Sequence, residues 1–171
     1  MNARTQYTTV SLIGMPGVGK STVGVILAKM IGLEFSDTDL AIQARERCTL
    51  QEILEREGHL RLREIEEEVL LDVPLERRVI ATGGSVVYSD TAMARLATAG
   101  PIIYLRADVK TLLGRVAANP ERGIASDGSQ TFQDIFNERT PLYERYATST
   151  VDAVAGTADA VAAMIVQALH A

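Results

Sequence analysis

The residues "GMPGVGKS", from Gly14 to Ser21, match the pattern G-x-x-x-x-G-K-S/T, which is typical of a phosphate-binding loop. The glycines let the backbone wrap around phosphate oxygens, and backbone N–H groups of the loop and of the following helix point inward. Lys20 then reaches the β and γ oxygens of a nucleotide, and the Ser21 hydroxyl can join the shell of a Mg²⁺ ion. We therefore expect the nucleotide to be bound by Gly17, Val18, Gly19, Lys20, Ser21 and Thr22.

Two acidic residues, Asp37 and Asp39, follow in the segment "FSDTDL" (35–40) at the predicted end of a short strand. Because side chains alternate in direction along an extended segment, residues i and i+2 point to the same side, and we expect these acids to share one neighbourhood. A turn or a helix N-cap would also explain them, since Asp and Thr satisfy free backbone N–H groups at such places.

The absence of two motifs found in other nucleotide-binding proteins favours a functional role for Asp37 and Asp39. The N-K-x-D motif that GTPases use to recognise the base does not occur. Motor-type ATPases place a magnesium-binding Asp at the end of an apolar strand, whereas the strand predicted at 77–82 runs into Gly83 and Gly84. We therefore expect one of the two acids to lie near Mg²⁺ and the other to face the group that accepts the phosphoryl group.

Apolar periodicity and capping signals predict the elements that position these residues. Short runs of β-branched and apolar residues predict strands at 8–14, 34–37, 77–82, 101–107 and 148–153. Helical spacing and caps predict helices at 20–32, 49–57, 60–73, 90–100, 108–119 and 131–147, and from Thr157 onward. Thr49 and Glu52 predict a capping box at the start of the second helix, and Asp90 is the predicted cap of the fourth. The segment 120–129 is poor in apolar residues and is predicted to be a mobile surface loop. Alternating strands and helices indicate an α/β domain with a mostly parallel sheet and helices on both faces.

Composition limits the class of protein. With 171 residues, 47% of them hydrophobic, the chain suits a single domain spanning 1–171. The net charge of −5 argues against nucleic-acid binding, which normally requires a basic surface. The apolar runs are too short to span a membrane and the N-terminus lacks a secretory signal, so we expect a cytoplasmic protein. The single Cys48 and the two histidines, His59 and His170, are interpreted as incidental to catalysis.

Six segments together resemble the shikimate kinase family over almost the whole chain. They are "GMPGVGKST" (14–22), "DTD" (37–39), "LREIEEEV" (62–69), "ATGGSVV" (81–87), the loop around Arg122, and "ERTPLYERYA" (138–147). The resemblance implies a three-layer α/β/α P-loop kinase fold with a five-stranded parallel sheet, substrate-binding helices at about 38–73 and a mobile lid loop at about 119–131. It also implies phosphorylation of the 3-hydroxyl of shikimate by MgATP, in aromatic amino-acid biosynthesis, and we expect a monomer.

The resemblance also implies roles for single residues. Asp37 resembles the acid near the metal, where Ser21 also lies, and Asp39 resembles the acid that holds the substrate hydroxyls and aligns the attacking one. Arg63 and Arg139 match the pair that binds the substrate carboxylate, for which a planar guanidinium fork is suited. Glu66, one helical turn from Arg63, could orient that arginine.

The remaining roles concern the glycine loop, the adenine contact and the lid. Gly83 and Gly84 match the loop whose backbone packs against the substrate ring. Arg115 resembles the residue that stacks on adenine, and Arg122 resembles the lid arginine that acts with Lys20 on the transferring phosphate. Arg63 as a surface ion pair and Arg115 as a solvated helix residue remain alternatives.

The chain departs from the family pattern at two places. The family usually has three consecutive glycines where this chain has Gly83, Gly84 and Ser85, and its lid usually has Arg-Pro-Leu where this chain has Arg122, Gly123 and Ile124. Both departures bear on the acceptor, so a related kinase for another hydroxy-acid, such as gluconate, is an alternative. A non-catalytic ATP-binding regulatory module is the alternative from another class.

Overall fold

A parallel sheet of five strands forms the centre of the protein. The computed structural model describes residues 7–118, 124 and 126–171. The strands are β1 (Thr9–Ile13), β2 (Glu34–Asp37), β3 (Arg78–Ala81), β4 (Ile102–Arg106) and β5 (Ser149–Asp152), in the order β2-β3-β1-β4-β5. All four neighbouring pairs are parallel. Each strand lies within its predicted range, so the predicted five-stranded parallel sheet is confirmed.

Helices connect the strands. They are α1 (Lys20–Ile31), α2 (Thr38–Glu46), α3 (Leu50–Glu57), α4 (His59–Asp72), α5 (Asp90–Ala99), α6 (Val109–Ala117), α7 (Phe132–Tyr146) and α8 (Ala158–His170), with a short 3₁₀ helix, η1 (Val86–Tyr88). Every helix that local patterns predict is present. Those patterns did not predict α2 or η1, although the resemblance places substrate-binding helices within 38–73.

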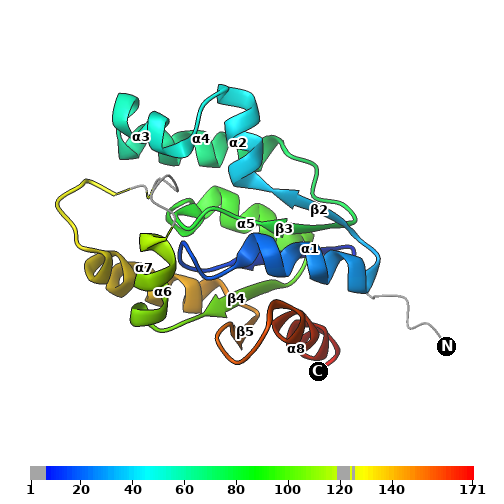
Figure 1. Cartoon of the computed structure of the whole chain (residues 1–171). Helices are drawn as coiled ribbons and strands as arrows, with labels where there is room; N and C mark the ends of the chain where they lie inside the picture. Colours follow the sequence, from blue (N-terminus) through cyan, green and yellow to red (C-terminus); the bar gives the residue numbers. More distant parts are fainter. Residues whose placement is uncertain (1–6, 119–123, 125) are drawn as a thin grey trace.

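The order of the strands distributes the helices over two faces. The chain moves across the sheet in one direction from β1 to β2 and in the opposite direction from β3 to β4. Because crossovers between parallel strands are right-handed, α1 and α5 lie on opposite faces (Figure 1). Helix α8 packs against α1, and α7 contacts β4 and η1. The result is the predicted α/β/α layering.

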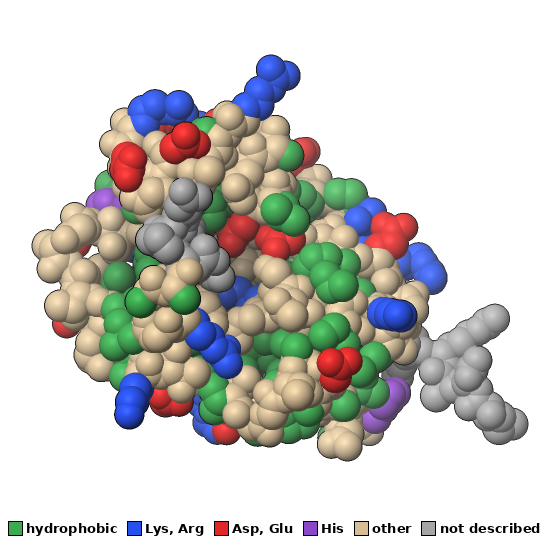
Figure 2. Space-filling view, viewed as in Figure 1, with side chains coloured by type: hydrophobic (Ala, Val, Ile, Leu, Met, Phe, Trp, Pro, Cys, Tyr) green, Lys and Arg blue, Asp and Glu red, His purple; other side chains and the backbone are tan. Residues whose placement is uncertain are grey.

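Helices α2, α3 and α4 have a small core of their own. Its buried side chains are Ile42, Leu50, Ile53, Leu62, Ile65 and Val69, and they form a cluster separate from the main core around the sheet. Figure 1 shows these three helices grouped beyond one edge of the sheet. In Figure 2 a hollow with acidic side chains on its wall separates this group from the rest of the molecule. The small core therefore holds α2 and α4 at one side of a cleft.

Two local predictions at helix starts have different outcomes. The capping box predicted at Thr49 is present: Glu52 N donates to Thr49 Oγ1 at 3.1 Å and Thr49 N donates to Glu52 Oε2 at 2.6 Å. The prediction that Asp90 caps the next helix is wrong. Ser89 has the extended backbone of an N-cap and its hydroxyl accepts from Ala92 N at 3.0 Å, so Asp90 is the first helical residue.

Candidate active site

The phosphate-loop residues form a turn between β1 and α1. Gly17 and Gly19 have φ values of 86° and 101°, in the left-handed region that favours glycine. Gly19 is the N-cap of α1 and contributes no side chain, so the first-turn backbone N–H groups of the helix are approached without obstruction. The Lys20 ammonium donates to the carbonyl oxygens of Gly14 at 2.7 Å and of Met15 at 3.1 Å. The loop thus holds a buried positive charge next to a helix N-terminus, an arrangement that binds anions.

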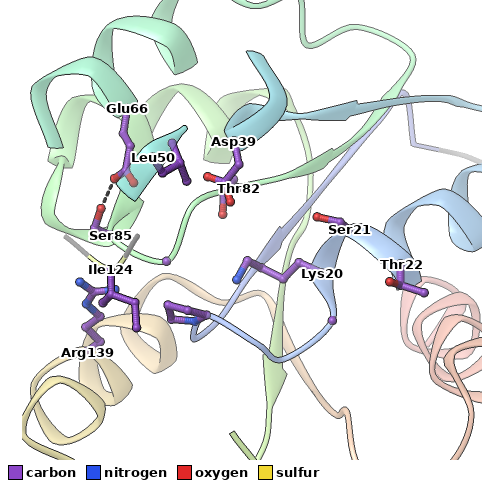
Figure 3. Close-up of a pocket in the computed structure, with 13 residues that line it drawn as sticks. Lys20, Ser21, Thr22, Asp39, Leu50, Glu66, Thr82, Ser85, Ile124 and Arg139 are labelled. Carbon is purple, nitrogen blue, oxygen red and sulfur yellow. Dashed lines mark hydrogen bonds between the residues drawn. The ribbon is translucent and has the colours of Figure 1, made fainter. Parts of the chain in front are cut away.

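A pocket extends from this loop toward α2, α4 and α7. Figure 3 shows Lys20 and Ser21 on one side and Asp39 and Glu66 on the other. Of the predicted site residues, the pocket is lined by Gly19, Lys20, Ser21, Thr22, Asp39, Gly84 and Arg139. The loop after β1, the start of α2 and the loop after β3 all lie at the carboxyl ends of parallel strands, where open α/β sheets bind ligands.

The two acids occupy different backbone environments. The prediction that they share one side of an extended segment is wrong, because β2 ends at Asp37 and Asp39 lies in the first turn of α2. Asp37 is the N-cap of that helix: its Oδ1 accepts from Asp39 N at 2.8 Å and from Leu40 N at 3.3 Å. Its Oδ2 accepts a hydrogen bond from Ser21 Oγ. The carboxylate therefore caps a helix and contacts the phosphate loop at the same time.

Thr38 joins the start of α2 to the glycine loop after β3. Its hydroxyl donates to the carbonyl of Ala81 at 3.3 Å and accepts from Gly83 N at 3.1 Å. A Cβ added at Gly83 would lie 3.2 Å from Asp39 Oδ1 and 3.0 Å from Glu66 Oε1. The backbone of Gly83 therefore lies against both carboxylates, and glycine keeps the space between them open.

Gly84 lies equally close to another part of the site. A Cβ at this position would be 2.8 Å from Pro16 Cδ and 3.0 Å from Nη1 of Arg139. The carbonyl of Gly84 also accepts a hydrogen bond from the hydroxyl of Tyr143. The two glycines thus bring the phosphate loop, the acids and Arg139 around a single turn of backbone.

The carboxylate of Glu66, which lines this pocket, has a raised pKa. Burial raises its pKa to about 8, and the negative charge of Asp39 adds to the rise. The positive charges of Arg139, Arg63 and Lys20 act in the opposite direction. Local patterns did not place Glu66 in the pocket. Glu66 follows the buried Ile65 and lies one turn from Leu62 and Val69, so it is an acid at the edge of the apolar face of α4. This pattern was the available sequence signal for a buried carboxylate.

Ser85, where the family pattern has a third glycine, is turned toward Glu66. Its side chain is buried and its hydroxyl donates to Glu66 Oε2, as Figure 3 shows. Both residues also line a second hollow, between α4 and η1, in which Arg63 and Tyr88 lie. The departure from the family pattern thus adds a hydrogen-bond donor to the wall of the pocket.

The two predicted carboxylate-binding arginines lie near one aromatic ring. Arg139 on α7 is 1% exposed and lines the main pocket. Arg63 on α4 is half-buried, and its Cζ lies 3.9 Å from the centroid of the Tyr88 ring. The Cζ of Arg139 is 5.4 Å from the same centroid. Neighbouring Arg61 pairs instead with Glu57, Glu64 and Glu68 at the surface.

Arg115 lies behind the phosphate loop. Its Nη1 donates to the carbonyls of Gly17 at 3.3 Å and Val18 at 3.1 Å. With the loop and the start of α8 it lines a depression of about 340 Å³. A role for Arg115 at adenine stays a prediction.

The predicted lid falls largely outside the described residues. Residues 119–123, which include Arg122 and Gly123, and residue 125 are not among them. Ile124 is described and lines the main pocket. Within residues 7–118, 124 and 126–171, no set of three His, Cys, Asp or Glu side chains is placed to hold a metal ion. In the same part of the chain, every helix is too short or too polar to cross a membrane.

Comparisons with known proteins agree with this geometry. The model of the family described as shikimate kinase matches residues 16–170. The shikimate kinase of Thermodesulfovibrio yellowstonii is 35% identical over 161 residues, which are 92% of each chain. A gluconokinase structure from Sinorhizobium meliloti, at 15% identity and a TM-score of 0.50, shares the fold alone.

Two solved structures are closer. Shikimate kinase from Acinetobacter baumannii, in complex with shikimate, has a TM-score of 0.89 and 30% identity, with 98% of this chain and 96% of that chain covered. The enzyme from Aquifex aeolicus has a TM-score of 0.80 and 28% identity, with 94% and 95% covered. The family match over most of the chain and these relatives confirm the predicted resemblance, and the chain belongs to the shikimate kinase family.

Proposed function

We propose that the protein transfers the γ-phosphoryl group of ATP to the 3-hydroxyl of shikimate, giving ADP and shikimate 3-phosphate. The observation that carries the proposal is the pocket in which Lys20 of the phosphate loop faces Asp39 and Arg139. Lys20 suits a phosphate, Asp39 suits a hydroxyl and the buried Arg139 suits a carboxylate. These are the reacting and charged groups of ATP and shikimate. The family membership of the chain supports the same reaction.

In the proposed mechanism the protein positions the reactants and neutralises charge. The loop from Gly17 to Thr22 binds the phosphates, with Lys20 beside the β and γ oxygens, and Arg115 lies against the adenine. Asp39 accepts a hydrogen bond from the 3-hydroxyl and takes its proton as the acceptor oxygen bonds to the γ phosphorus. The bond between that phosphorus and the β–γ bridging oxygen breaks, and the bridging oxygen leaves with ADP.

Arginines and glycines orient the acceptor in this proposal. Arg63 and Arg139 bind the carboxylate of shikimate, and the backbone at Gly83 and Gly84 packs against its ring. Arg122, on a lid at about 119–131, contacts the transferring phosphate after closure, which excludes water as a competing acceptor. Helices within 38–73 carry the acceptor side of the site, and the whole chain acts as one domain.

Ser21 and Asp37 are the residues proposed to hold Mg²⁺. Their fit rests on the hydrogen bond between them, because it brings a hydroxyl and a carboxylate together at the N-terminus of α1, where the phosphates are expected. A bound Mg²⁺ ion supplies positive charge to the phosphate oxygens. The proposed setting is a monomer in the cytoplasm that acts on small molecules, with no nucleic-acid or membrane partner.

A coupled assay of ADP release tests the function. Shikimate should stimulate ADP release from MgATP, whereas gluconate and quinate should not. A phosphorylated gluconate or quinate product in place of shikimate 3-phosphate would make the protein a related hydroxy-acid kinase. Binding of ATP with no acceptor-dependent ADP release would make it a regulatory module.

A further inference from the structure

Tyr88 lies outside the motifs that carry the family resemblance, yet its side chain contacts both proposed carboxylate-binding arginines. The Cζ of Arg63 is 3.9 Å and that of Arg139 is 5.4 Å from the centroid of its ring. Guanidinium groups within about 6 Å of an aromatic centroid are attracted by the negative charge of the ring face. The three residues come from α4, η1 and α7, so the ring joins three separate elements.

The two arginines differ in burial. Arg139 is 1% exposed, so its side chain is held by packing. Arg63 is half-buried on a helix where other charged side chains form surface ion pairs. A long side chain in that position samples several rotamers unless a neighbour restricts it. The ring of Tyr88, at 3.9 Å, is placed to provide that restriction.

The hydroxyl of Tyr88 fixes the orientation of the ring. It donates a hydrogen bond to Oε1 of Glu138, and Oε2 of the same carboxylate accepts from Gln130 Nε2 at 2.8 Å. The bond from Tyr88 is the largest cause of the lowered pKa of Glu138, which stays a charged acceptor. Tyr88 is therefore anchored at its hydroxyl, which also has a hydrogen bond with the Arg139 side chain, while the face of its ring remains available to Arg63.

We propose that Tyr88 is a positioning residue, which holds Arg63 beside Arg139 in the geometry that binds the carboxylate of the acceptor. The ring face performs this role and the hydroxyl supports it by orienting the ring. The proposal rests on the proposed function, because it assumes that the two arginines bind the acid group of shikimate.

The experiment compares Tyr88→Leu, which removes the ring face, with Tyr88→Phe, which keeps it. Tyr88→Leu should raise the KM for shikimate by roughly 5- to 10-fold, the effect expected from losing a partly buried cation–π contact, with the KM for ATP unchanged. Tyr88→Phe should restore the KM for shikimate to within about 2-fold of the wild type. In an Arg63→Ala background, Tyr88→Leu should have no further effect, because the group that it positions is absent.

Tyr146→Leu is the matched control. Tyr146 also has an arginine near its ring, Arg145 at 5.4 Å, and an acid, Asp90, that accepts from its hydroxyl. Because it lines neither the main pocket nor the hollow between α4 and η1, its loss should leave both KM values unchanged. If Tyr88→Leu does not fold, Tyr88→Met replaces it, since the longer and more flexible side chain of methionine adapts to the space but has no ring face.

The outcomes distinguish a failure of the proposed function from a failure of the proposed role of Tyr88. A wild-type enzyme that does not phosphorylate shikimate overturns the function and the role of Tyr88 with it. With an active wild type, an unchanged KM for shikimate in Tyr88→Leu overturns the positioning role alone. An equal rise in KM in the Arg63→Ala background also overturns it, because Tyr88 would then act without Arg63.

Discussion

Ser21 and Asp37 are joined by a hydrogen bond from the serine hydroxyl to Oδ2 of the carboxylate, while Oδ1 of the same group caps α2. The phosphate loop is thereby tied to the start of the helix that carries Asp39. The helix cap that was one explanation of the acidic pair is therefore present at Asp37, and the same carboxylate contacts the phosphate loop. This arrangement places Asp37 beside the phosphate loop, whereas Asp39 lines the main pocket, and these positions fit the roles proposed for the two acids.

The different roles proposed for Asp37 and Asp39 predict different kinetic effects of their substitution. Asp39→Asn should lower kcat by about 100-fold, the usual size of a general-base contribution, with the KM for ATP little changed. Asp37→Asn should raise the Mg²⁺ concentration needed for half-maximal activity, and it should keep the fold because Asn is also a good N-cap. Magnesium titrations of both variants test this, and identical kinetic changes in the two would contradict the assignment.

Lys20 supplies the buried positive charge of the phosphate loop. Lys20→Ala should reduce kcat by at least about 100- to 1,000-fold, as for the loss of a group that stabilises charge in the transition state. Lys29→Ala is the matched control, since Lys29 lies exposed at the other end of the same helix and should not affect turnover. Near-normal turnover by a folded Lys20→Ala enzyme would remove the loop lysine from the mechanism.

The raised pKa of Glu66 predicts a pH-dependent stability. Its ordinary value is 4.5 and its value in the folded protein is about 8, so between these values the folded state holds a proton that the unfolded state releases. The contribution to the free energy of unfolding is therefore full below about pH 4.5 and is lost as the pH rises through about 8.

Glu66→Gln should remove this dependence. Relative to the wild type, the variant should gain stability on the order of 1–3 kcal/mol between about pH 5 and pH 9. Thermal unfolding at both pH values measures the difference. Glu64→Gln, on the exposed face of the same helix, is the control and should leave the pH dependence unchanged. Parallel pH curves for the wild type and Glu66→Gln would show that the Glu66 carboxylate titrates normally.

The close approach at Gly84 predicts a steric effect on the acceptor end of the site. In Gly84→Ala the new methyl group would meet Pro16 at 2.8 Å and Arg139 at 3.0 Å. We expect a loss of about 1–3 kcal/mol in stability and a raised KM for shikimate, because Arg139 must shift. Gly114→Ala is the control: no atom lies within 4 Å of its Cβ position, so it should be neutral or stabilising. Wild-type KM and stability in Gly84→Ala would contradict the close contact between the glycine loop and the arginine.

Contiguous patterns made much of the fold predictable. The central strands β1, β3 and β4 are short, mainly apolar runs, and every predicted strand range contains a strand. The capping box at Thr49 involves groups three residues apart, so the sequence alone determines it. The phosphate loop is likewise a local structure, because its glycine torsions and the following helix depend on consecutive residues.

The arrangement of Asp37 and Asp39 could not be predicted from contiguous sequence patterns. The alternation rule assumed that the extended backbone continued through Asp39, but the Asp37 cap begins a helix at Thr38. Thr38 also bonds to Ala81 and Gly83, 43 and 45 residues away, and those contacts exist only after β3 pairs with its neighbours. The position of Asp39 in the pocket is thus a consequence of packing between distant segments.

Tertiary structure alone decided which charged groups share an environment. In the sequence, Glu66 is one of three consecutive glutamates and Tyr88 is an aromatic residue after an apolar pair. The pKa of Glu66 is raised because the fold removes its carboxylate from water and brings Asp39 next to it. Tyr88 meets Arg63 and Arg139 because α4, η1 and α7 converge there. Desolvation and electrostatic interactions depend on distances through space, and separation along the chain does not determine those distances.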